Sequence, residues 1–109
     1  MQSTVVYKRL IDDLSRFFDR FGEAHSNWSR QLRQWSTELD GISTDAELCE
    51  HARRVSRNVE GIGLLRDVVI SDPAADERLN ALRSALFEEA VRIVTLCSPA
   101  EVAGRTPAA

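Results

Sequence analysis

Apolar side chains in this 109-residue chain recur every three or four positions in four separate stretches, and this spacing is the strongest constraint on its fold. Residues three and four apart lie on the same face of an α-helix, so each stretch forms an amphipathic helix whose apolar side must be buried. The pattern predicts helices over about residues 4–21, 27–40, 45–60 and 74–97. Because such helices bury their apolar faces against one another, we expect an all-α fold, a small helical bundle.

Local sequence chemistry supports three of the predicted helix boundaries. Thr44 and Glu47 fit a capping box, in which the hydroxyl and the carboxylate bind backbone amides that the first helical turn leaves unpaired. Asp72 followed by Pro73 is typical of a helix start, because aspartate accepts an amide hydrogen bond and proline lacks an amide there. Gly41 is expected to end the second helix.

The apolar segment 64–70 and the C-terminal end give weaker signals. The β-branched residues of segment 64–70 favour extended structure, but a single strand in a helical chain would have no partner for its backbone hydrogen bonds. We therefore expect this segment to be a short helix. After Pro99 the apolar period stops, which predicts one helical domain over residues 1–97 and a disordered tail over 98–109.

Charge and composition disfavour several classes of partner and location. The chain has 14 basic and 17 acidic residues, and a net charge of -3 gives no field that would attract nucleic acid or an anionic membrane. The sequence shows neither a secretory signal pattern at its start nor an apolar run of about 18 residues, so we expect a cytoplasmic protein. In that setting, Cys49 and Cys97 are expected to be reduced, buried thiols.

Motifs that carry catalytic or cofactor chemistry are not found. The chain has no phosphate-binding loop, paired CxxC, HExxH, nucleophile elbow or EF-hand loop, so we predict no catalytic residue, no cofactor and no metal. Glu47, Glu50 and His51 are the best metal candidates, because Glu47 and His51 lie one helical turn apart. A solvated helix face is the favoured interpretation of this group, and His25 is expected to be a surface or capping residue.

Five residues are candidates for contact with a partner. Tryptophan is enriched at the energetic centres of protein interfaces, although packing of Trp28 and Trp35 in the core is the favoured alternative. Together with His51, the residues Arg53, Arg54 and Arg57 form the only local basic cluster in the sequence. Glutamates on the same helix favour a mixed-charge exposed face over a nucleic-acid footprint.

Two short segments, Trp28 with Leu32 and Gly63 with Asp67, also resemble a known pattern. They are similar to a family of small uncharacterised bacterial helical proteins that have a Trp-x3-Leu segment and a Gly-Gly-Met-Gly-Ser-x-Asn-Asp-like segment. In the second segment Glu60 and Leu64 stand where the family has its first glycine and its serine, and Arg66 stands where it has asparagine. The resemblance implies a compact helical fold and no known activity.

A small, acidic chain with two tryptophans and no catalytic motif favours a non-enzymatic protein-binding module. Examples are an immunity protein against a bacterial toxin or a phage-encoded inhibitor of host defence. One alternative is a homodimeric structural or adaptor module that pairs through the apolar seam from Trp28 to Leu39. A further alternative is a weak nucleic-acid binder that uses the arginine-rich helix face.

Overall fold

The computed structural model describes residues 2–20, 25–60 and 68–97. These contain four α-helices: α1 (Val5–Asp19), α2 (Ser26–Asp40), α3 (Asp45–Glu60) and α4 (Pro73–Thr95). The described residues contain no β-strand. The predicted all-α fold is therefore confirmed, with helix bounds close to the predicted ones. The predicted tail, 98–109, lies outside the described residues.

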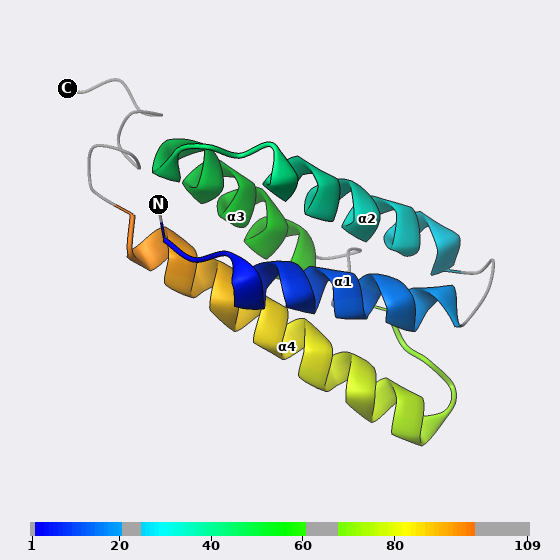
Figure 1. Ribbon diagram of the computed structural model, residues 1–109. Helices are drawn as coiled ribbons and strands as arrows, with labels where there is room; N and C mark the ends of the chain where they lie inside the picture. The colour runs from blue at the N-terminus through cyan, green and yellow to red at the C-terminus, as the bar shows by residue number, and fades with distance from the viewer. Residues whose placement is uncertain (1, 21–24, 61–67, 98–109) are drawn as a thin grey trace.

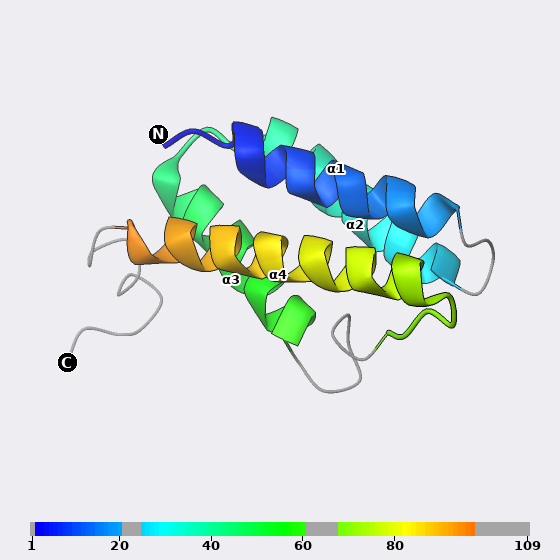
Figure 2. The same ribbon diagram turned by 90° about the horizontal axis from the view of Figure 1, so that it is seen from below.

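Consecutive helices run in opposite directions and form a bundle (Figure 1). α1 packs on both α2 and α4, and α3 packs mainly on α4. α1 and α4 lie side by side in both views (Figures 1 and 2). The start of α1 therefore lies at the same end of the molecule as the end of α4.

The core is formed by the apolar faces of all four helices, together with Ile70 from the segment before α4. Burying these side chains is the main favourable contribution to folding, because each removes apolar surface from water. The fully or almost fully buried apolar residues of the core cluster are Tyr7, Ile11, Leu14, Phe17, Phe18, Leu32, Trp35, Leu39, Leu48, Ala52, Val55, Val59, Ile70, Leu79, Leu86, Ala90 and Ile93.

Buried serines line the contact between α1 and α2. Their small side chains allow the two helices to approach, and their hydroxyl groups need hydrogen-bond partners because they are removed from water. Ser15 donates to the Ser29 carbonyl at 3.3 Å, and Ser36 donates to the Asp12 carboxylate at 2.6 Å. Lys8 donates to the Ser36 hydroxyl at 2.7 Å, so these polar groups are satisfied.

The predicted capping signals of α3 and α4 are confirmed. The Thr44 hydroxyl accepts the Glu47 amide at 3.2 Å and donates to the Glu47 carboxylate at 2.9 Å. The Asp72 carboxylate accepts the Ala75 amide at 3.2 Å. Gly41 follows α2 as its C-terminal cap, as predicted.

The short helix predicted over 64–70 is not formed at residues 68–70, the part of this segment that the structure describes. Residues 64–67 lie outside the described residues, and 68–70 have no regular secondary structure. Two side chains of α4 bind this backbone instead: Asp76 accepts the Ile70 amide at 2.9 Å, and Arg83 donates to the Val68 carbonyl at 2.8 Å. Non-helical backbone is stable here because these partners replace helical hydrogen bonds.

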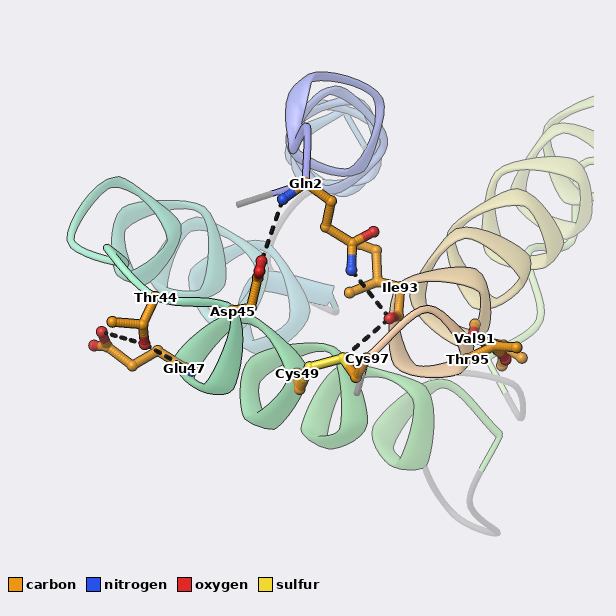
Figure 3. The surroundings of a disulfide bond; sticks show 9 residues. All are labelled: Gln2, Thr44, Asp45, Glu47, Cys49, Val91, Ile93, Thr95 and Cys97. Atoms are coloured by element: carbon orange, nitrogen blue, oxygen red, sulfur yellow. Dashed lines mark hydrogen bonds between the residues drawn. A yellow bond between two sulfur atoms is a disulfide. The ribbon is translucent and has the colours of Figure 1, made fainter. Parts of the chain in front are cut away.

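The prediction of reduced thiols is wrong, because Cys49 and Cys97 form a disulfide (Figure 3). Their Cα atoms are 6.4 Å apart, within the range that a disulfide spans. The bond ties α3 to the residues that follow α4. The sequence prediction failed because two cysteines 48 residues apart reveal nothing of their separation in space.

Gln2 joins the same two elements next to the disulfide (Figure 3). Its backbone amide donates to the Asp45 carboxylate at 3.2 Å, and its side-chain amide donates to the Ile93 carbonyl at 3.2 Å. The start of the chain is thus bonded to α3 and α4.

Among the described residues, no helix is both long and apolar enough to cross a membrane.

Candidate interaction site between α2 and α3

A cleft of about 360 Å³ lies where α2 turns into α3. Its volume falls in the range of ligand-binding pockets in proteins, roughly 300–1,000 Å³. The end of α2, the turn that follows it and one face of α3 line the cleft. The lining residues are Glu38, Gly41, Ile42, Glu47, Glu50, His51 and Arg54.

One face of α3 supplies most of the polar groups. Glu47, Glu50, His51 and Arg54 follow one another at steps of three, one and three residues, so all four lie on the same side of the helix. The helix begins at the Thr44–Glu47 capping box, whose hydrogen bonds stabilise its first turn.

His51 forms the closed inner wall of the cleft, and the expectation that it lies on a solvated face is wrong. The side chain is only 1% exposed. Its Nε2 donates to the Trp35 carbonyl at 2.8 Å, and its Nδ1 accepts the Tyr7 hydroxyl at 2.7 Å. The carbonyl can only accept, so this pairing assigns the proton of the neutral ring to Nε2. The sequence missed this burial because a histidine at the edge of an apolar stripe gives no sign of partners on other helices.

Burial shifts the pKa of both members of the Tyr7–His51 pair. It lowers the pKa of His51 below its ordinary 6.5, because the desolvated imidazolium is disfavoured; the Trp35 carbonyl bond and the Glu38 charge oppose this in part. It raises the pKa of Tyr7, because the phenolate is disfavoured in the same way. Both groups are therefore neutral at physiological pH.

The cleft has an excess of negative charge. Glu38 pairs with Arg54 across α2 and α3 at 3.1 Å, and the other carboxylate oxygen of Glu38 is buried without a hydrogen-bond partner among the described residues. The Thr44 hydroxyl bond lowers the pKa of Glu47, which keeps that carboxylate ionised. Three carboxylates against one guanidinium leave the lining a net charge of −2.

The structure brings Glu47, Glu50 and His51 to one cleft but does not arrange them as metal ligands. Both His51 nitrogens are bonded within the fold, so neither has a lone pair free for an ion. Within the part of the chain that the structure describes, no three histidine, cysteine, aspartate or glutamate side chains are placed to hold a metal.

The sequence-predicted contact residues are separated by the fold. Trp35 is 2% exposed and belongs to the core, which is the alternative favoured from sequence. Trp28 is half-buried against the same core. Of the arginines, only Arg54 lines the cleft; Arg57 is exposed and Arg53 is half-buried on α3.

Glu38 and Ile42 were not identified from the sequence. Glu38 looks like any polar residue on the outer face of α2, and its place in the cleft depends on how α3 folds back after the turn. The short span from Gly41 to Thr44 was the available signal, because it forces the end of α2 and the start of α3 together.

His25 precedes α2 and contacts the Phe18 ring, with 5.7 Å between ring centres; it makes no side-chain capping bond.

Gly63 and Asp67, which carry half of the family resemblance, lie outside the described residues. No protein-family model, no curated protein and no solved structure matches this chain.

Proposed function

We propose that this protein is a non-enzymatic protein-binding module that receives a basic side chain of its partner in the α2–α3 cleft. The proposed class is an inhibitor, such as a toxin-immunity protein or a phage anti-defence protein. The observation that carries the proposal is a concave site with three carboxylates and one guanidinium in its lining.

The cleft is suited to an arginine or lysine side chain. The Glu47 and Glu50 carboxylates can pair with a guanidinium or ammonium group, and Ile42 offers apolar surface for its alkyl stem. The His51 wall is held by hydrogen bonds to two other helices, so the site is formed before a partner arrives. Such preorganisation lowers the entropic cost of binding.

The same contacts favour binding over catalysis. A general base needs a free lone pair within reach of a substrate proton, and Nδ1 of His51 already accepts the Tyr7 hydroxyl. Its Nε2 proton is bound by the Trp35 carbonyl. We therefore assign His51 a structural role.

A capture experiment with charge-reversed variants tests the proposal. Lysate of the source cells is passed over the immobilised wild-type protein, Glu50→Lys, Glu50→Gln and the control Glu88→Lys, which places the same charge change on the exposed face of α4. We expect a partner protein that Glu88→Lys captures as well as the wild type does. Glu50→Gln should capture less of it, and Glu50→Lys should capture none. Its retention should fall as the salt concentration rises.

Identical capture by all four proteins would contradict the use of this cleft. The variants must first show the circular-dichroism spectrum of the wild type. Cross-linking of the captured partner must then place one of its arginines or lysines beside α3, because capture alone does not identify the contact.

A homodimeric module is the alternative, and exposed apolar side chains favour it. Val5 and Leu96 are 64% and 62% exposed, and the Gln2–Ile93 hydrogen bond brings the start of α1 close to the end of α4. The Trp28–Leu39 seam is not free for pairing, because Trp35 and Leu39 are buried in the monomer. Light scattering that finds a dimer, which Val5→Glu converts to a monomer, would favour this alternative.

Weak nucleic-acid binding through Arg53, Arg54 and Arg57 is less favoured, because Arg54 is already paired with Glu38. Salt-sensitive binding of DNA or RNA that Arg57→Glu abolishes would support it.

We place the protein in the cytoplasm as part of this proposal, and the disulfide makes the location testable. Most cytosolic thiols are kept reduced, whereas disulfides persist in oxidising compartments. Fractionation of the source cells should find the protein with cytoplasmic markers. Acid quenching of the cells followed by alkylation of free thiols measures the oxidised fraction of the Cys49–Cys97 pair, and recovery of the protein only from an oxidising compartment would contradict the cytoplasmic placement.

A further inference from the structure

A second hollow, of about 210 Å³, lies between α1 and α4, away from the acidic cleft. α1 supplies most of its lining and α4 supplies one side chain. The lining residues are Asp13, Arg16, Phe17, Arg20 and Arg78. Helix α1 ends and α4 begins at the same end of the molecule (Figures 1 and 2), which is why arginines distant in sequence meet here.

The three arginines are placed by helical spacing and by helix packing. Arg16 and Arg20 are four residues apart, so they lie on the same face of α1. Arg78 comes from near the start of α4, which packs against α1. Arg16 pairs with Asp13 at 2.5 Å. Among the described residues, no carboxylate pairs with Arg20 or Arg78.

The charge of this hollow is opposite to that of the whole chain. Three guanidinium groups and one carboxylate give the lining a net charge of +2, whereas the chain carries -3. Like charges gathered around one hollow repel one another, and an anion between them removes that repulsion. A phosphoryl group carries about −1.5 to −2 charges near neutral pH, which matches the excess.

We propose that this hollow binds a phosphoryl group of the phosphate monoester class. The planar fork of arginine binds two phosphate oxygens at once, which a lysine ammonium does not do. Phe17, which is only 6% exposed, closes the hollow on its core side. The site goes beyond the proposed protein-binding function, because it shares no residue with the α2–α3 cleft.

Isothermal titration with inorganic phosphate at constant ionic strength tests the site, with the amide shifts of Phe17 and its neighbours followed by NMR. We expect saturable binding that Arg20→Gln and Arg78→Gln each weaken about tenfold, the effect of losing about 1.4 kcal/mol. Arg57→Gln, which removes an exposed arginine from α3, should leave binding unchanged. Asp13→Asn should strengthen binding, because it removes the carboxylate that competes for Arg16.

Two further ligands identify the source of the phosphoryl group. Glycerol phosphate represents a free monoester, and a short phosphoserine peptide represents a phosphorylated protein. Tighter binding of one of them than of inorganic phosphate supports the site and names the source.

Absence of saturable phosphate binding would overturn the proposal, and so would an equal loss in Arg57→Gln and Arg78→Gln, since both indicate general charge attraction only. Glu50→Lys should bind phosphate as the wild type does, so failure of the protein-binding proposal is distinguishable from failure of this one.

Discussion

His51 connects three helices through two hydrogen bonds, from α3 to Tyr7 on α1 and to the Trp35 backbone on α2. Each bond satisfies a polar group that is removed from water. The pair also packs edge to face, with the ring centres of Tyr7 and His51 5.5 Å apart. At this position, therefore, a polar side chain takes part in the core without leaving a donor or an acceptor unpaired.

Replacing His51 by alanine should lower the free energy of unfolding by about 3 kcal/mol. The substitution opens a cavity and leaves the Tyr7 hydroxyl and the Trp35 carbonyl without partners. Urea denaturation measures the loss. Tyr7→Phe, which removes the hydroxyl and keeps the ring, should cost less, about 1–2 kcal/mol. A cost for His51→Ala no larger than that of the exposed Arg57→Ala would contradict the structural role.

The lowered pKa of His51 predicts that stability decreases in acid. Above the ordinary pKa of 6.5 both states hold a neutral ring, and the stabilisation is complete. As pH falls below 6.5, the unfolded chain binds a proton that the folded chain excludes. This histidine should then reduce the free energy of unfolding by up to about 1.4 kcal/mol per pH unit until its folded-state pKa is reached.

Urea midpoints measured from pH 8 to pH 5 test this linkage. His51→Gln should lose this part of the pH dependence, whereas His25→Gln, which removes the other histidine, should keep it. NMR of the imidazole Cε1 proton should show His51 neutral below pH 6.5 in the folded wild type. Equal slopes in the two variants would exclude His51 as the source.

At the scale of elements, local chemistry fixes where a helix starts. Packing against the other helices fixes which of its faces is buried. The Asp72 cap and Pro73 determine where α4 begins, independently of what it packs against. On α1 the apolar stripe spans both Val6 and Tyr7, yet Val6 is 54% exposed and Tyr7 is fully buried. The rotation of α1 about its axis is thus set by its contacts with α2 and α4.

Asp72→Ala should lower the free energy of unfolding by about 1 kcal/mol, because the Ala75 amide loses its partner at the start of α4. Thermal denaturation followed by circular dichroism measures the change. Asp72→Asn should restore most of the stability, since its side-chain oxygen accepts the same bond. Ser84→Ala, on the exposed middle of α4, should have no such cost and serves as the control.

At the scale of the molecule, the disulfide closes a long covalent loop. Cys49 and Cys97 are separated by 48 residues, so their bond restricts the unfolded chain more than it restricts the native bundle. Loop-closure entropy gives a stabilisation of up to about 4 kcal/mol for a loop of this length. The Gln2 hydrogen bonds hold the same end of the bundle together.

The Cys49→Ala, Cys97→Ala double variant should therefore unfold at a lower urea concentration than the oxidised wild type, by about 2–4 kcal/mol. Dithiothreitol should shift the wild type toward the variant and leave the variant unchanged. Equal midpoints with and without reductant would show that the bond contributes nothing to stability.

The sequence by itself determined the four main helices of the described residues, most of their bounds and the caps at Thr44 and Asp72. These are local properties, because helical periodicity and capping involve residues within a few positions of each other. The tertiary structure alone decided the burial of His51, the Cys49–Cys97 bond and both clusters of charge. Each depends on which faces of separate helices meet, and residue spacing within one helix carries no information about a partner on another.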